Sequence, residues 1–476
     1  MEKAKPATRP ESAAMAVRWL AVAAAMLAGG AGVAARANDN DTAAGLLGKL
    51  AEDVPLELAS VLPQKNTDFG DVQLVAALIL QPKDDDFADH FGGWSSVLAS
   101  EDARTLLAVS DTGMWLTATL AYDAKGVLTG VDNAKVAPMQ NVTDSGSIAG
   151  NKNWADAESL VSAEGGPWST EDPVLVSFER KHRIWQYDTS PGGPKPHDIH
   201  PGVAAVLSQC RVNGGVEAAE VLSDGRLFAV CEHPPPESPD SEHVPGWLFE
   251  NWRADESGRR LGVTDIWLPH DMVFSPTDAA RLPHTSGVEH DHLLLLSRAY
   301  VEGDGDGPKG SAMRLSRVHL PHTEGGGVLH VQLLAELWAV DGYPIDNMEG
   351  LSVVPGSPAG VSTEAFATAF VMSDDNFNAN EKTVLLQFAL GTLSDDSPVF
   401  RSHAADGAAP STDGPAPASA PKKSAIQSRT AVYVLVGGGA AGITLASALL
   451  AVDLLKAHFR RRALGVALDE IDEDLV

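Results

Sequence analysis

Short apolar runs separated by Gly, Pro, Asp and Asn dominate the chain from Phe69 to Leu390. The runs have the length of β-strands, and the 3.6-residue period of long amphipathic helices is missing from this region. Many short strands with frequent turn signals are typical of a sandwich, a barrel or a propeller. The pattern therefore predicts an all-β domain over residues 69–390.

The apolar runs recur as a repeated unit. In each unit a polar or acidic residue begins one strand, a turn follows, and a second apolar strand ends in Ser or an acid. Five copies can be traced, which begin at Phe91, Asp156, Gly214, Ser275 and Asp346. An internal repeat of this kind favours a β-propeller. We predict five to six blades, with 69–80 either completing a sixth blade or closing the ring through a shared strand.

Acidic residues occupy similar places in these repeats. If Glu158, Glu217, Asp278 and Glu349 are equivalent, they are spaced by 59, 61 and 71 residues. Because blades of about 40 to 50 residues are common, these repeats must carry long loops. The innermost strand of each blade faces the central channel, so the repeat would aim several carboxylates at one axis.

Clustered carboxylates repel one another, and either a cation or shifted pKa values must relieve them. Ca²⁺ takes six to eight oxygen ligands and suits such a rim. The predicted metal ligands are Glu158, Glu217, Asp278, Glu349 and Asp374. The alternative is that these acids only form a structural ring or cap turns, since Asp and Asn bond their own backbone there.

Basic residues on the same rim would bind an anionic substrate. Arg180 directly follows Glu179, and Arg298 ends an apolar strand. The guanidinium group suits phosphate because its planar fork binds two oxygens. The predicted catalytic residues are Glu349, Asp375, Arg180 and Arg298. The alternative for the basic run 180–183 is a solvated charge cluster on a hairpin.

Several motifs together resemble the phytase-like family, which is described as having esterase-like activity of phytase. They are Asp156-Ala-Glu158, Gly215-Val-Glu217, Asp346-Asn-Met-Glu-Gly-Leu-Ser and Ser373-Asp-Asp-Asn-Phe-Asn, the last two being the most specific. The resemblance covers about residues 69–390. It implies a β-propeller and an activity on phosphate or other esters. The chain departs from the family pattern at Ser159 in the second repeat, where a Gly is usual, and at Ser96 in a similar place in the first. Residues 233–258 form a long Pro-rich insert.

The two ends of the chain predict membrane attachment. An uncharged run from Trp19 to Ala35 follows Arg18, which resembles the core of a signal peptide over 1–37; a signal anchor is the alternative. Residues 38–68 are predicted as a spacer, and 391–429 as a disordered stalk rich in Ser, Ala, Pro and Asp.

The C-terminal run, uncharged from Thr430 to Val452, predicts a transmembrane helix over 430–455. Basic residues follow it at once, which places the tail 456–476 in the cytoplasm. The sequence thus predicts a single-pass type I membrane protein with its propeller extracytoplasmic or lumenal.

Composition narrows the function classes. The formal net charge of −29 argues against a nucleic-acid partner, because phosphate contacts need clustered Lys and Arg. The chain has two cysteines, Cys210 and Cys231, so a disulfide framework and a Cys-based zinc site are excluded. One bridge between them stays open. No Gly-x-Ser-x-Gly elbow is present, and we interpret the histidines near 197–200, 284–292 and 319–322 as surface loops.

These observations favour a membrane-anchored, metal-assisted hydrolase with a small anionic ester as substrate. The alternative is a non-catalytic propeller that binds a ligand or protein partner at the membrane surface, because propellers host many unrelated functions.

Overall fold

The computed structural model describes residues 47, 51–62, 67–87, 89–143, 146–188, 195–239, 241–254, 258–283, 291–302, 309–320, 326–358 and 365–391. The chain divides into two compact units, Met1–Asp406 and Gly407–Val476, and every described residue lies in the first. The predicted leader, transmembrane helix and tail, and the stalk beyond Gly391, lie outside the described residues. Within the described part, no helix is long and apolar enough to cross a membrane.

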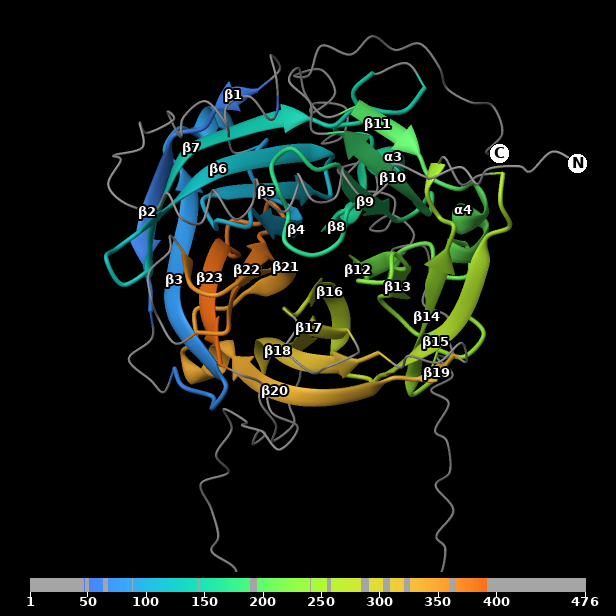
Figure 1. Ribbon diagram of the computed structural model, residues 1–476. Helices are drawn as coiled ribbons and strands as arrows, with labels where there is room; N and C mark the ends of the chain where they lie inside the picture. Colours follow the sequence, from blue (N-terminus) through green and yellow to red (C-terminus); the bar gives the residue numbers. More distant parts are fainter. Residues whose placement is uncertain are drawn as a thin grey trace, which may run out of the picture. The chain divides into compact units, whose positions relative to one another are not determined.

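The described strands form five sheets, each of four or five strands, arranged as the blades of a propeller (Figure 1). From inside outward, blade 1 contains β4 (Trp94–Ala99), β5 (Thr105–Ser110), β6 (Met114–Tyr122), β7 (Leu128–Pro138) and β1 (Glu52–Asp53). Blade 2 contains β8 (Ala157–Ser162), β9 (Val174–Phe178), β10 (Arg183–Asp188) and β11 (Lys195–Asp198).

Blade 3 contains β12 (Val216–Val221), β13 (Leu227–Cys231), β14 (His243–Glu250), β15 (Gly262–Pro269) and β19 (Gly327–Val328). Blade 4 contains β16 (Ser275–Arg281), β17 (His292–Val301), β18 (Gly310–His319) and β20 (His330–Trp338). Blade 5 contains β21 (Asn347–Pro355), β22 (Ala367–Asp374), β23 (Thr383–Leu390), β3 (Val72–Pro82) and β2 (Leu56–Ser60). The described chain therefore has five blades.

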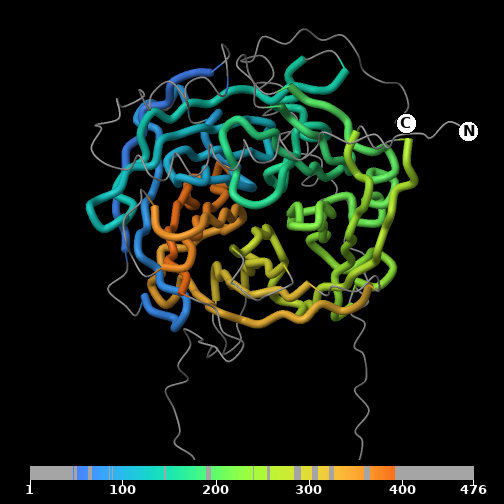
Figure 2. Tube along the Cα trace, viewed as in Figure 1, coloured from blue at the N-terminus to red at the C-terminus, as the bar shows by residue number. Residues whose placement is uncertain are grey.

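The two ends of the folded region meet in blade 5. Figure 2 shows the blue N-terminal strands beside the orange-red C-terminal ones, and β3 pairs antiparallel with β23. The segment 69–80 therefore closes the ring through a shared strand, as one of the two predictions held, and adds no sixth blade. Two short strands, β1 and β2, lie inside the predicted spacer 38–68, so the domain begins earlier than 69.

The core consists of layers between neighbouring blades. Along β5, Leu106 and Ala108 pack toward blade 5, whereas Leu107 and Val109 pack toward blade 2. This alternation is the two-residue period of a strand, but both faces are apolar because each blade has a neighbour on either side. The sequence accordingly shows nearly continuous apolar runs. On the outer strand β15, by contrast, buried and exposed residues alternate toward its C-terminal end.

Two short helices join strands in blades 2 and 3. α3 (Lys152–Ala155) directly precedes β8, and α4 (Gly202–Leu207) lies between β11 and β12. Short 3-10 turns cover Asp85–Phe87 and Ala339–Asp341. A disulfide joins Cys210, after α4, to Cys231 at the end of β13.

Candidate active site

Each innermost strand begins with a β-bulge at the same place. The register shifts between Trp94 and Ser96, Ala157 and Leu160, Val216 and Ala218, Pro276 and Asp278, and Met348 and Gly350. A bulge inserts an unpaired residue and re-aims its side chain. We call the bulged residues in equivalent positions the bulge ring: Ser95, Glu158, Glu217, Thr277 and Glu349.

A second ring arises where the chain leaves the next strand of each blade. The residue paired with the start of each bulge is Ser110, Phe178, Cys231, Ser297 or Ser373. The residue that follows it comes to the same end of the blade. We call this set the exit ring: Asp111, Glu179, Glu232, Arg298 and Asp374. Both rings lie at one mouth of the channel, and carboxylates outnumber cationic groups in them.

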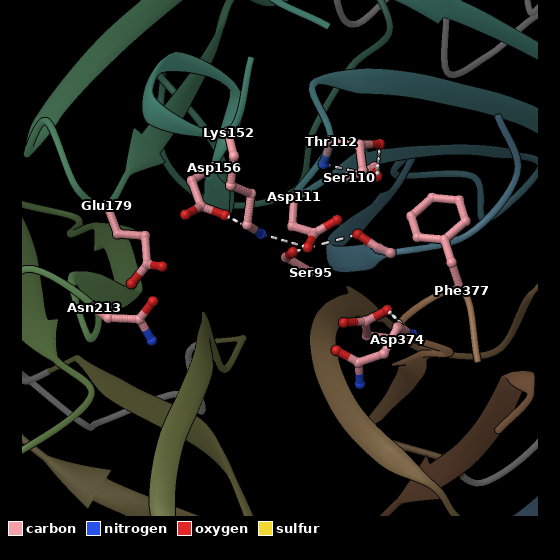
Figure 3. Close-up of polar contacts among 12 residues, drawn as sticks. Ser95, Ser110, Asp111, Thr112, Lys152, Asp156, Glu179, Asn213, Asp374 and Phe377 are labelled. Carbon is pink, nitrogen blue, oxygen red and sulfur yellow. Dashed lines mark hydrogen bonds and ion pairs between the residues drawn. The ribbon is translucent and has the colours of Figure 1, made fainter. Parts of the chain in front are cut away.

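Figure 3 shows this mouth in close-up. Asp111 of blade 1, Asp156 and Glu179 of blade 2, and Asp374 of blade 5 surround the same central region. The Lys152 ammonium lies between two of them, 2.6 Å from Asp111 Oδ2 and in an ion pair with Asp156. The Lys152 ammonium is therefore an internal cation among these carboxylates.

One group of carboxylates at the mouth is close enough to share an ion. Asp156, Glu158 and Glu179 are all buried, and each offers a ligand oxygen within 4.8 Å of the others. Asp156 also forms ion pairs with Lys152 and Arg180. Among the described residues this is the one group of three or more His, Cys, Asp or Glu side chains whose ligand atoms all lie this close together.

Burial and mutual repulsion raise pKa values in this group. Burial raises the pKa of Glu158 well above its usual value, and Glu217 and Glu179 add repulsion. Burial, together with a hydrogen bond to Asp156, raises the pKa of Glu179 to about 8, although the Gly214 N–H and Arg180 lower it. Without a bound cation, Glu158 and Glu179 therefore retain protons near neutral pH.

Arg298 pairs with two carboxyl groups on the opposite side of the mouth. Its Nη2 lies 3.2 Å from Glu232 Oε1 and 3.1 Å from Glu349 Oε1. Burial raises the pKa of Glu349 to about 7 despite Arg298. Burial alone would also raise the pKa of Glu232, but its hydrogen bond with His233 and the charge of Arg298 lower it. Two neighbouring carboxyl groups thus differ in protonation at neutral pH.

Glycines allow close approaches at the mouth, both between neighbouring blades and within one blade. Gly214 N donates to Glu179 Oε2 at 2.6 Å, and a Cβ on Gly215 would lie 2.7 Å from the Cβ of Glu179. Gly93, with φ +65°, leaves room for Asp111, whose Oδ1 would be 2.3 Å from an added Cβ. A side chain at Gly215 or Gly93 would therefore displace the exit-ring residue that it faces.

The part of the chain that contains both rings matches a known protein family. A family model described as "Phytase-like: Esterase-like activity of phytase" matches residues 89–377, a span that includes every residue of both rings. The chain belongs to the phytase-like family. The expectation drawn from the sequence motifs is confirmed.

A search of curated proteins found no match. Solved structures similar to this phytase-like chain include the β-propeller domain of Myceliophteria thermophila Cps50 (Swd1), with 7% identity over 71% of this chain and 99% of that one, at a TM-score of 0.28. The WD40 domain of Toxoplasma gondii coronin has 9% identity over 74% and 91%, at 0.30. A mitotic checkpoint complex chain has 11% identity over 82% and 99%, at 0.29. The five-bladed assignment therefore depends on the strand pairing itself.

Most residues that the sequence nominated for the site come together. The predicted residues found in the two rings are Glu158, Glu217, Glu349, Asp374 and Arg298. Arg180 adjoins them, because it pairs with Asp156 and donates to Asn213 Oδ1 at 2.7 Å. Only Glu158 of the predicted ligands belongs to the close carboxylate group.

Asp278 and Asp375 are placed differently. The bulge makes Thr277 the equivalent of Glu217, so the sequence alignment of Asp278 is off by one residue. Asp278 Oδ2 accepts from Ser96 Oγ at 2.7 Å and Leu351 N at 2.8 Å, which ties blade 4 to blades 1 and 5.

Asp375 likewise makes structural contacts. Its Oδ1 accepts from Gly93 N and Phe377 N, both at 3.1 Å, and its Oδ2 accepts from Thr383 Oγ1 at 3.0 Å. It joins the loop after β22 to blade 1.

Sequence reasoning did not nominate several residues of the mouth: Asp111, Lys152, Asp156, Glu179 and Glu232. The pattern of apolar strands that end in Ser or an acid contained the signal for three of them. Lys152 gave no signal, because its position depends on the four-residue helix α3.

Proposed function

We propose that this phytase-like protein hydrolyses phosphate or other esters with the help of a bound divalent cation, for which Ca²⁺ is the first choice. The observation that carries the proposal is the buried group Asp156, Glu158 and Glu179, whose ligand oxygens lie within 4.8 Å of one another. Carboxylate oxygens are the ligands that hard cations such as Ca²⁺ prefer.

A cation bound by this group would polarise a phosphoryl or carbonyl oxygen and activate a water molecule. Arg298 would orient the substrate. Its side chain is 30% exposed although its Nη2 pairs with Glu232 and Glu349, so the guanidinium group can also meet a substrate oxygen. Arg180 offers a second positive charge on the other side of the mouth. A small anionic ester fits this pair of guanidinium groups.

Glu349 is suited to transfer a proton in the reaction. Its pKa of about 7 matches the value that favours general acid–base catalysis near neutral pH. Asn347 Nδ2 donates to Glu349 Oε1 at 2.7 Å and, with Arg298, fixes the carboxyl group in place. The neighbouring Glu232, with its lowered pKa, stays ionised and keeps Arg298 in position.

Lys152 competes with a divalent cation for the same oxygens. Its side chain is 49% exposed, whereas that of Asp156 is fully buried. The ammonium can therefore move into solvent when an ion binds Asp156. We expect Lys152 to weaken cation binding. When no divalent cation is bound, its positive charge should reduce the repulsion among the carboxylates of Asp156, Glu158 and Glu179.

For the cellular location, we propose that residues 1–37 direct export and that 430–455 anchor the protein, with the propeller outside the cytoplasm. The Cys210–Cys231 disulfide supports this proposal, because disulfides persist in oxidising compartments.

A non-catalytic binding propeller is the second candidate. The observation that favours it is that Asp156 is already neutralised by Lys152 and Arg180. In that case the acids of the mouth would be structural, and the mouth would present a surface to a partner.

The two candidates differ in turnover. The test is hydrolysis of p-nitrophenyl phosphate and p-nitrophenyl acetate by the full-length protein, with Ca²⁺ or with a chelator. Glu158→Gln removes a ligand of the group. Glu220→Gln is the matched control, because Glu220 is another buried carboxyl on an inner strand, bonded to the backbone N–H groups of Val221 and Arg281.

The proposal predicts Ca²⁺-dependent turnover that Glu158→Gln loses and Glu220→Gln keeps. Absence of turnover with either ester, while Ca²⁺ still raises the melting temperature of the wild type, would instead support the binding propeller.

A further inference from the structure

A row of histidines crosses three strands of blade 4. His292 at the start of β17 pairs with His319 at the end of β18, and His319 pairs with His330 at the start of β20. Directly paired residues of adjacent strands project from the same face of a sheet. The three imidazoles, which are separated by up to 38 residues in sequence, therefore lie side by side.

The rings are in contact. The ring centroids of His292 and His319 are 4.5 Å apart with an interplanar angle of 61°, and those of His319 and His330 are 4.9 Å apart at 67°. Two imidazoles that bind one zinc ion at about 2.0–2.1 Å place their centroids roughly 5 Å apart in steeply inclined planes. The observed pairs are within about half an ångström of this arrangement.

We propose that His292, His319 and His330 form a binding site for a borderline transition-metal ion such as Zn²⁺ or Cu²⁺. Neutral imidazole is a preferred ligand of these ions, whereas Ca²⁺ and Mg²⁺ prefer oxygen. His319 is the common ligand, since it contacts both other rings. The side chain of His330 is exposed and those of His292 and His319 are partly exposed, so an ion can reach the row from solvent.

The three histidines do not yet surround a single ion position, because no set of one ring nitrogen from each lies within 4.8 Å of one another. An ion would be bound first by His319 and one neighbour. The third imidazole would then join by rotation about its Cβ–Cγ bond, a torsion with broad energy wells.

The row is separate from the carboxylate mouth. Arg298, at the mouth, lies six residues along β17 from His292, which corresponds to roughly 20 Å of strand. The histidine site therefore does not depend on the proposed hydrolase function, and its ligands select a different class of ion.

The test is titration of the full-length protein with Zn²⁺ by calorimetry at about pH 7.5, and with Cu²⁺ observed by electron paramagnetic resonance. We expect one Zn²⁺ site whose affinity falls by about tenfold or more in His319→Ala, since even groups that only support metal ligands contribute about 10- to 100-fold. The Cu²⁺ spectrum should show coupling to imidazole nitrogens that this variant loses. His90→Ala, which removes an exposed histidine elsewhere, should change neither result.

Melting temperatures of the ion-free variants establish that they fold, and His330→Ala serves as the second variant because that side chain is exposed. Unchanged Zn²⁺ affinity in both His319→Ala and His330→Ala would refute the site. Loss of Zn²⁺ binding in Glu158→Gln, but in neither histidine variant, would also refute it and would assign the ion to the mouth.

Discussion

The Glu179→Gln substitution tests the electrostatics of the mouth through stability. The pKa of Glu179 is about 8 in the folded protein, against a usual value of 4.5. A glutamine at this position resembles the protonated acid: its oxygen can accept from Gly214 N and its amide can donate to Asp156. The substitution therefore removes the ionisation of Glu179 and retains its hydrogen bonds.

The sign follows from proton linkage. Between these two pKa values the folded wild type keeps a proton that the unfolded chain has lost, so wild-type stability falls as pH rises. Each pH unit in this window costs about 1.4 kcal/mol. From about pH 5.5 to pH 8.5, the free energy of unfolding of Glu179→Gln should therefore rise relative to the wild type by on the order of 3 kcal/mol.

The assay is urea unfolding followed by tryptophan fluorescence at the two pH values, in the presence of a chelator. Other groups with raised pKa values, such as Glu349 and Glu220, titrate in both proteins, so the subtraction largely removes them. A stability difference that does not change with pH, or that favours the wild type at high pH, would refute the reasoning. It would show that Gly214, Gly215 and Arg180 stabilise the carboxylate as an anion.

Three further predictions follow from single contacts. Lys152→Met should raise Ca²⁺ affinity at pH 8 by about tenfold, measured by calorimetry, because the competing ammonium is removed. The same change at Lys135, which forms an ion pair on the outer strands, should leave the affinity unchanged. A weaker affinity in Lys152→Met would contradict the competition. Gly93→Ala should lower stability by more than about 2 kcal/mol, since the added Cβ would lie 2.3 Å from a carboxylate oxygen of Asp111. Gly150→Ala is the control, because its added Cβ meets nothing within 4 Å, and it should cost only about 1 kcal/mol in thermal unfolding. Reducing the disulfide should cost about 2–4 kcal/mol in the same assay, and an unchanged melting temperature would show that it contributes little.

The sequence predicts the propeller well because blade architecture depends on local signals. Turn-forming Gly, Pro, Asp and Asn separate the apolar runs, and the Asp346 and Ser373 segments carry the family motifs. The acids Glu158, Glu217 and Glu349 occupy the same place in their repeats and, as predicted, arrive at one mouth.

The rest of the site depends on features that the apolar pattern does not contain. A β-bulge adds one residue without changing the hydrophobic run, so the sequence could not separate Thr277 from Asp278. Asp111 and Glu232 end apolar runs in the sequence, but only the pairing between strands shows that they reach the same mouth. The Cys210–Cys231 bridge required the position of α4.

The most direct test of the account is diffraction from crystals of the protein soaked in Mn²⁺ or Ca²⁺ near pH 8. The account predicts an ion among the carboxylates of Asp156, Glu158 and Glu179, with anomalous signal for Mn²⁺ and with Lys152 displaced from Asp156. Lys152 and Arg180 still paired to Asp156, with no ion at the group under saturating Ca²⁺, would contradict it.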